Sequence, residues 1–126
     1  MLVRGIRGAT TVESNTREEI LDAARELLDT IVTANELPHE HVASIIFSTT
    51  ADLNAEFPAV AARELGWTDV ALECVHEMNV PGSLPKCLRI LMHVNTERSA
   101  AEIQHIYLRG ARVLRRDLVE KQEATS

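Results

Sequence analysis

The stretch Val42-Ala-Ser-Ile-Ile-Phe-Ser-Thr49 is the clearest strand in the chain, and the fold class follows from it. It is a run dominated by β-branched and aromatic residues, with the length of a buried strand. Such a run predicts a strand inside a sheet that other elements cover. The segments on either side of it indicate which elements these are.

A long amphipathic helix is predicted before this strand. Thr16-Arg-Glu-Glu19 has the pattern of a capping box, with Thr16 as the N-cap and Glu19 reaching back. Apolar residues then recur with helical spacing, namely Ile20, Ala24, Leu27 and Ile31. We expect the helix to end before Pro38, because the residue preceding a proline leaves the helical region.

The other segments predict one short helix and four more strands. The short helix covers residues 57–65, with Pro58 in its first turn and Gly66 after its end. A loop covers residues 78–85, and Ser99-Ala-Ala-Glu102 is a second, smaller capping box. Strands are expected at residues 2–10, 70–74, 86–95 and 106–114, the last interrupted near residue 110.

These elements predict an α+β fold, in which a mixed five-stranded sheet carries one long helix and one or two short helices on one face. A chain of 126 residues with a single long helix cannot cover both faces of such a sheet. We therefore expect a homo-oligomer whose sheets or helices pack together. One domain is expected over residues 1–115, followed by a mobile, charged tail at 116–126.

The composition argues against several classes of protein. A net charge of −6 and an aromatic content of 3% are unlike a protein that binds nucleic acid or a membrane surface. The two cysteines have neither a CxxC spacing nor a secreted framework, so a cytoplasmic location is expected. His39-Glu-His41 lacks the spacing of a zinc-binding helix, and we expect neither a metal nor a cofactor.

Arginines at the edges of apolar segments are the main candidates for a site. Arg7 and Arg89 lie on predicted strands, where a guanidinium is costly unless an anion meets it. Residues that could complete such a site are Glu77 as an acceptor, Cys74 and Tyr107 as polar edges, and Phe57 and Leu114 as an apolar wall. A purely structural salt bridge between Arg89 and Glu77 explains two of these residues equally well.

A catalytic thiolate at Cys74 is another interpretation of the same region. Cys74, His76 and Glu77 are close in sequence, but on a strand Cys74 and His76 share a face while Glu77 points to the opposite one. No cationic helix terminus is evident beside Cys74 to stabilise a thiolate. A cysteine in such a position is more often an ordinary small core residue.

Nine blocks of sequence carry a resemblance to a known family. The run Arg4-Gly-Ile-Arg-Gly-Ala-Thr-Thr-Val-Glu13 is similar to the N-terminus of the monofunctional, trimeric chorismate mutases of the bacterial α/β type. The agreement continues in order and spacing up to residue 118, in Glu18-Glu-Ile-Leu21, Ala51-Asp-Leu53, Phe57-Pro-Ala59, Arg63-Glu-Leu65, Cys74-x-x-Glu77-Met78, Lys86-Cys-Leu-Arg89, His105-Ile-Tyr107-Leu108 and Val113-Leu-Arg115.

The resemblance implies the rearrangement of chorismate to prephenate, a Claisen-type step on the route to phenylalanine and tyrosine. It also implies a homotrimer that resembles a pseudo-barrel of sheets with the helices outside, and active sites between neighbouring subunits. A pericyclic step needs no nucleophile, proton transfer or redox cofactor, and the sequence offers none of them. A trimeric regulatory module that binds a carboxylate metabolite without turnover, and a deaminase-like hydrolase, are the alternatives.

The resemblance further implies a role for each matching residue. Arg89 faces the ether oxygen of the breaking bond, while Arg7 and Tyr107 hold a substrate carboxylate and the ether region. Glu77 and Cys74 meet the ring hydroxyl, and Phe57 and Arg63 come from the adjacent subunit. Residues assigned to the walls of the pocket are Glu73, Val75 and His76, and those assigned to a closing C-terminal segment are Leu114 and Arg115. The chain departs from the family pattern at Val60, Glu73 and Arg116.

Overall fold

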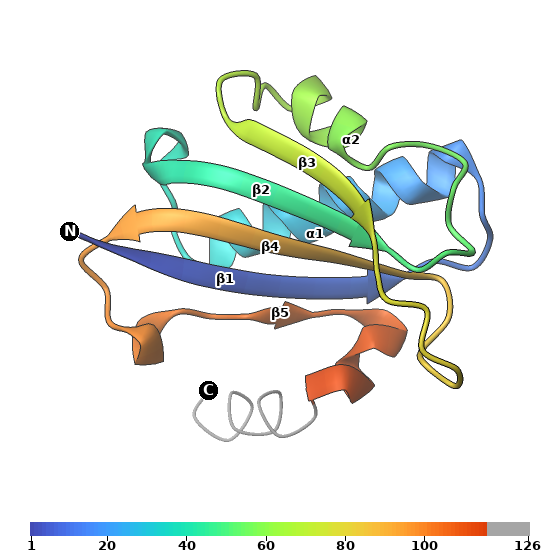
Figure 1. Ribbon diagram of the computed structural model, residues 1–126. Coiled ribbons are helices and arrows are strands. Elements are labelled where there is room, and N and C mark those ends of the chain that lie inside the picture. Colours follow the sequence, from blue (N-terminus) through green and yellow to red (C-terminus); the bar gives the residue numbers. More distant parts are fainter. Residues whose placement is uncertain (116–126) are drawn as a thin grey trace.

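Five strands form one mixed sheet in the order β3-β2-β4-β1-β5 (Figure 1). The computed structural model describes residues 1–115, so the expected tail at 116–126 lies outside the described residues. Strand β4 runs antiparallel to its neighbours β1 and β2, whereas the outer pairs β2·β3 and β1·β5 are parallel. The strands are β1 (Leu2–Thr11), β2 (Val42–Thr49), β3 (Ala71–His76), β4 (Cys87–Thr96) and β5 (Ile106–Tyr107).

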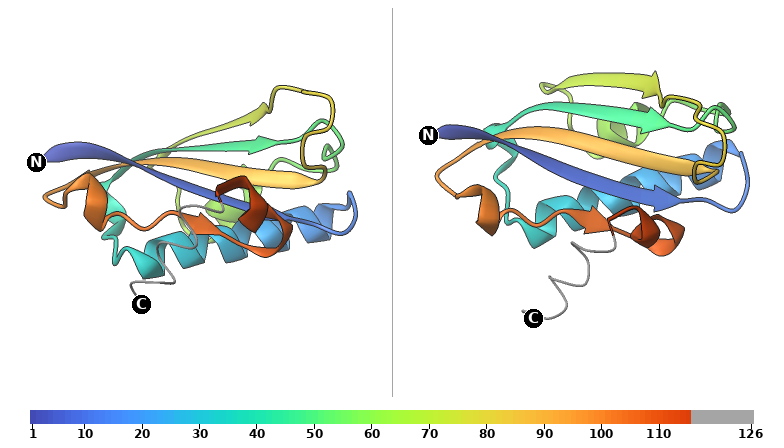
Figure 2. Two further views of the ribbon diagram at one scale, coloured as in Figure 1. Left: turned by 90° about the horizontal axis from the view of Figure 1, so that it is seen from below. Right: turned by 60° about the horizontal axis from the view of Figure 1, so that its bottom comes forward.

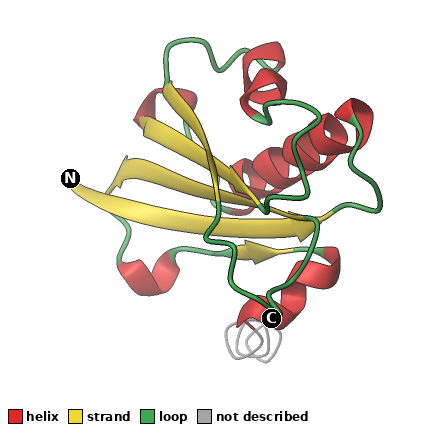
Figure 3. Ribbon diagram, turned by 45° about the vertical axis from the view of Figure 1, so that its right-hand side comes forward, coloured by secondary structure: helices red, strands yellow, loops and turns green. Residues whose placement is uncertain are grey.

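The helices α1 (Arg17–Ala34) and α2 (Ala59–Glu64) lie on the same face of this sheet. Figure 2 shows α1 running beneath the strands, and in Figure 3 it passes behind them. Short 3₁₀ helices are η1 (His39–His41), η2 (Ala100–Glu102) and η3 (Arg109–Arg115). The predicted α+β fold is therefore confirmed for the single chain. None of the described helices is long and apolar enough to cross a membrane.

The core lies between α1 and the sheet, and alternation along each strand decides which side chains enter it. On β4, Leu88, Ile90, Met92 and Val94 are buried against the helices, while Arg89, Leu91 and His93 point to the other face. Gly8 of β1 lets α1 approach closely, because a Cβ at this position would lie 2.7 Å from the Ile31 side chain. The face opposite α1, hereafter the open face, exposes apolar side chains, among them Val3, Val75 and Leu91.

Two predicted boundaries and one predicted element need correction. The strand expected at residues 106–114 ends at Tyr107, and η3 follows. The reason is local: Arg109 adopts a left-handed conformation (φ 52°), and the Gly110 N–H donates to Thr11 Oγ1 at 3.1 Å, so the chain turns away from the sheet. The short helix begins at Ala59, which leaves Phe57 in the preceding loop. The strand expected at 70–74 continues to His76.

The N-terminal cap of α1 is only partly as expected. Thr16 Oγ1 accepts a hydrogen bond from the Glu19 N–H at 3.2 Å, which confirms Thr16 as the N-cap. The Glu19 carboxylate, however, accepts from the Glu13 N–H at 3.3 Å and from the Ser14 hydroxyl. It therefore fixes the chain between β1 and α1. Ser99 and Glu102 form the complete capping box that the sequence predicts.

The C-terminus of α1 is held by Asn35, which is 1% exposed. The Asn35 side-chain amide donates to the carbonyls of Ile31 at 3.0 Å and Gln104 at 2.9 Å, and its oxygen accepts from the Gln104 N–H at 2.8 Å.

We expect Asn35→Ala to lower the free energy of unfolding by about 2 kcal/mol, because buried partners lose their hydrogen bonds. Urea unfolding at fixed protein concentration measures this; Asn79→Ala, at an exposed loop position, is the control and should leave the midpoint unchanged. Equal midpoints for the two variants would contradict the expectation.

Candidate active site

Arg89 lies at the centre of a row of residues that crosses the open face. Strand register places Arg89 beside Ala9 of β1 and Ser48 of β2. Ser48 is in turn paired with Val75 of β3, and Ala9 with Tyr107 of β5. Because directly paired residues point to the same face of a sheet, strands far apart in sequence present these side chains together.

A cavity of about 240 Å³ opens over this row. Four of the residues predicted for the site line it: Arg7, Glu77, Arg89 and Tyr107. Arg7 comes from β1, Arg89 from β4 and Tyr107 from β5, while Glu77 follows the last residue of β3. The Glu77 N–H donates to the Thr49 carbonyl at 2.8 Å, which ties this residue to the end of β2. We call these four residues the open-face group.

Arg89 and Glu77 are close, but their contact does not satisfy Arg89. Arg89 Nε lies 3.4 Å from Glu77 Oε2, with side chains that are 27% and 36% exposed. This geometry does not make a hydrogen bond, and Arg89 Nε and Tyr107 Oη are both buried without a hydrogen-bond partner among residues 1–115. Buried donors normally find partners. Two buried donors without a hydrogen-bond acceptor beside one cavity are therefore the arrangement expected where a polar ligand supplies the acceptors.

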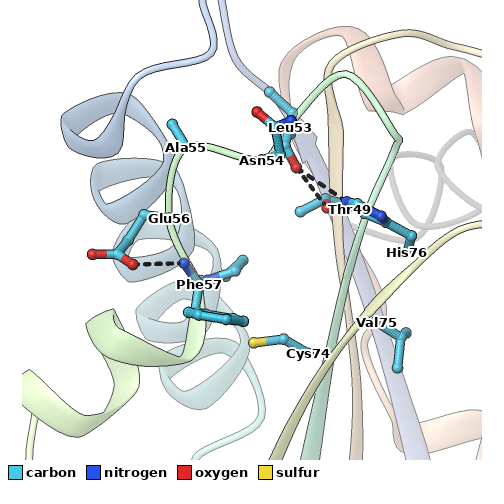
Figure 4. Close-up of a pocket in the computed structure, with 10 residues that line it drawn as sticks. Thr49, Leu53, Asn54, Ala55, Glu56, Phe57, Cys74, Val75 and His76 are labelled. Carbon is cyan, nitrogen blue, oxygen red and sulfur yellow. Dashed lines mark hydrogen bonds between the residues drawn. The ribbon is translucent and has the colours of Figure 1, made fainter.

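Several of the other predicted residues lie around the α2 side of β3. Cys74 and Phe57 line a pocket of about 340 Å³, and Figure 4 shows the Cys74 sulfur directed toward the Phe57 ring. Phe57, Arg63, Glu73 and Cys74 line an adjoining recess. Glu73 lies at its border, because its pairing with Ile46 directs its side chain to the open face. We call these four residues the β3–α2 group. Val75 and His76 line both the 340 Å³ pocket and the open-face cavity.

The C-terminal segment reaches the site through η3. Leu114 packs with Ala111 against Tyr107 and Cys87, so it lies next to the open-face group. Arg115 is the last residue of η3. Arg109, at the start of η3, forms an ion pair with Glu26 of α1, in which Arg109 Nη2 donates to both carboxylate oxygens at 3.2 and 3.0 Å. This pair ties the segment to the helix layer. Arg116 falls outside the described residues.

The thiol of Cys74 has the surroundings of a neutral core cysteine. Burial is the largest influence and raises the pKa of the thiol, although the backbone of Ala59 and the charge of Arg63 act in the opposite direction. Cys74 and His76 share the face toward α2, as the alternation predicts, and Glu77 lines the cavity on the other face. The structure thus does not assemble a Cys74–His76–Glu77 set. Among residues 1–115, no three His, Cys, Asp or Glu side chains are grouped to hold a metal ion.

Two residues next to Arg89 were not among the predicted site residues. Ser48 lines the open-face cavity, and Cys87 is buried two positions before Arg89, against Tyr107. Ser48 could have been found from the alternation of Ser44, Ile46 and Ser48 along β2, which marks the face opposite the core. Cys87 gives no comparable signal, because its contact with Tyr107 depends on strand order.

Known proteins are similar to this chain over almost its whole length. Residues 3–118 match the family described as "Chorismate mutase type I". "Chorismate mutase AroH" of Bacillus subtilis (strain 168) is 49% identical over 119 residues, which cover 94% of each chain. The protein of the same name from Thermus thermophilus is 47% identical over 122 residues, covering 96% of this chain and 100% of its own. A solved chorismate mutase structure from Clostridium thermocellum superposes with a TM-score of 0.86 at 51% identity, over 87% of this chain and 98% of that one. The chain therefore belongs to the type I chorismate mutase family, the family that its N-terminal run resembles.

Proposed function

We propose that the rearrangement of chorismate to prephenate, the activity of this protein's family, takes place in the open-face cavity beside Arg89. The observation that carries this location is the pair of buried, unpartnered donors, Arg89 Nε and Tyr107 Oη. Chorismate is a dianion with an ether oxygen and a ring hydroxyl, so it supplies several acceptors to such donors. The reaction is intramolecular: one C–O bond breaks while one C–C bond forms, and no atom enters or leaves.

Arg89 supports the reaction by electrostatic stabilisation. As the C–O bond breaks, negative charge grows on the ether oxygen, and a fixed guanidinium aimed at that oxygen binds the transition state better than the ground state. The residue sits on the central strand of the sheet, paired on both sides, so its backbone cannot move away as the charge develops. Arg7 and Tyr107 hold the carboxylate and the ether region from the adjacent strands. Holding the compact, reactive conformer contributes a further part of the rate.

Glu77 has two parts in this proposal. Its carboxylate accepts a hydrogen bond from the ring hydroxyl, and its charge balances Arg89 at 3.4 Å. Cys74 also contributes to the hydroxyl region, but its thiol faces Phe57 on the other side of β3. The part of Cys74 nearest the open face is therefore its main chain, on a strand at the edge of the sheet.

A second copy of the chain completes the site. Within one chain, Phe57, Arg63 and Cys74 line a recess on the α2 side of β3, whereas Arg89 and the rest of the open-face group line the cavity on the other side. We infer a homotrimer, with sheets packed together, in which Phe57 and Arg63 of one copy meet the open-face group of the next. The exposure of Val3 (60%), Val75 (43%) and Leu91 (37%) on the open face, and of Phe57 (65%), supports such packing.

Glu77→Ala is expected to lower kcat/KM by about 10- to 100-fold, since a hydrogen bond to a charged group is worth ~1.5–3 kcal/mol. The variant should still fold, because the side chain is partly exposed. Glu77→Gln should lose less, as it keeps an acceptor oxygen. The steady-state loss of chorismate absorbance is measured for both variants and for the wild type. Glu97→Ala removes a carboxylate that is 80% exposed, and it should match the wild type. A fully active Glu77→Ala would contradict this role.

A further inference from the structure

The pairing between β1 and β5, which holds Tyr107 and begins one residue after Arg7, is very short. Strand β5 has 2 residues, and it pairs Ile106 with Gly8 and Tyr107 with Ala9 of β1. At its C-terminal end the Leu108 N–H donates to the Ala9 carbonyl at 2.9 Å, after which the chain turns into η3. Arg7 therefore lies one position before the ladder begins.

A histidine side chain supplies the bond that the ladder lacks at Arg7. If the parallel pairing continued by one residue, the Arg7 N–H would donate to the carbonyl of Gln104. That carbonyl instead accepts from the Asn35 side chain at 2.9 Å. The Arg7 N–H donates to Nδ1 of His105 at 3.0 Å, so an imidazole nitrogen takes the place of the missing carbonyl.

The residues on both sides of His105 are held by hydrogen bonds or strand pairing. The residue before it, Gln104, is bonded through both its N–H and its carbonyl to the buried side chain of Asn35. The residue after it, Ile106, is paired with Gly8. Because a backbone N–H donates to Nδ1, that nitrogen carries no proton in this arrangement. His105 is thereby fixed between α1 and β1, with its acceptor directed at the Arg7 backbone.

We propose that His105 is a positioning residue, which fixes the Arg7 backbone so that the Arg7 guanidinium is presented to the cavity beside Arg89 and Tyr107. This inference rests on the proposed function, because it acts through the part that Arg7 has in binding the dianion. A long arginine side chain places its charge accurately only when its backbone does not shift. Arg7 is in register with Leu91 on the β4 side, and on the β5 side the acceptor of its N–H among residues 1–115 is Nδ1 of His105.

Two nearly isosteric substitutions of His105 test the inference. In His105→Asn the amide oxygen is as many bonds from Cα as Nδ1 is, so it can accept from the Arg7 N–H; in His105→Leu a methyl group stands there. We expect His105→Leu to lower kcat/KM about tenfold and His105→Asn to remain within about twofold of the wild type, the range of one positioning hydrogen bond. His41→Leu, on η1, is the control and should have no effect. Unfolding midpoints are recorded for every variant.

A double-mutant cycle with Arg7→Ala separates positioning from a general structural effect. If His105 acts through Arg7, His105→Leu will cause no further loss in the Arg7→Ala background. A tenfold loss that persists there, or equal losses in His105→Leu and His105→Asn, would overturn the inference and leave the proposed function standing. Full activity of Arg7→Ala would overturn both the role of Arg7 and this inference, whereas a wild-type protein without turnover would overturn the proposed function itself.

Discussion

Arg89→Lys is expected to lower kcat at least about a hundredfold, although lysine keeps the positive charge; removing one such donor costs ~3–4 kcal/mol in other enzymes. Arginine presents a planar fork of N–H donors, whereas lysine is a mobile point charge on a flexible stem. Lysine also lacks Nε, the atom that is buried beside Glu77 and without a hydrogen-bond partner among the described residues. The developing charge on the ether oxygen would lose a donor whose direction the sheet fixes.

The measurement is steady-state kcat for the wild type, Arg89→Lys and Arg89→Ala. Because the lost interaction belongs mainly to the transition state, kcat should fall more than KM rises. Arg25→Lys on α1 is the matched control: its side chain is 36% exposed and pairs with Asp22, away from the open face. It should leave kcat unchanged. An Arg89→Ala protein with nearly wild-type kcat would show that the electrostatic mechanism is wrong.

Arg63→Ala and Arg89→Ala, each nearly inactive alone, are expected to regain activity when their subunits are mixed. In the proposed trimer a site takes Arg89 from one copy and Arg63 from its neighbour. After unfolding and joint refolding of equal amounts, about one quarter of the sites will combine two undamaged halves, by random assortment in a ring of identical interfaces. Activity near that fraction of the wild type, in a particle of three chains by sedimentation, is the expected result.

The matched control mixes Arg89→Ala with Glu77→Ala. Both residues belong to the open-face group of the same chain, so every site in these mixed oligomers keeps one damaged half. No recovery is expected. Recovery in both mixtures, or in neither, would contradict a site that is divided between copies at β3.

The elements that could be predicted from the sequence are those with local signals. The β-branched run at Val42–Thr49 and the N-cap at Thr16 each identify an element from adjacent residues, and both are confirmed. Strand order is not a local property, so the position of β4 between β1 and β2 could not be derived from periodicity. The turn after Tyr107 was missed because it depends on a non-glycine residue, Arg109, in a left-handed conformation that the sequence does not mark.

The residues of the candidate site could be predicted from the sequence, but much of their arrangement in space could not. Alternation along β3 correctly separates Cys74 from Glu77, since the side-chain period of a strand is two. It does not reveal that Phe57 and Arg63 lie on the far side of β3 from Arg89, because that depends on the path of the loop before α2. The bond from Arg7 to His105 joins residues 98 positions apart and has no sequence signal at all.

The most direct test of the electrostatic role of Arg89 follows the loss of chorismate absorbance on adding the purified protein, with Arg89→Ala assayed beside it. We expect saturable conversion to prephenate by the wild type, reduced at least about a hundredfold in the variant. Chorismate that binds to the wild-type protein without being converted would contradict it, and would instead indicate a module that senses the metabolite.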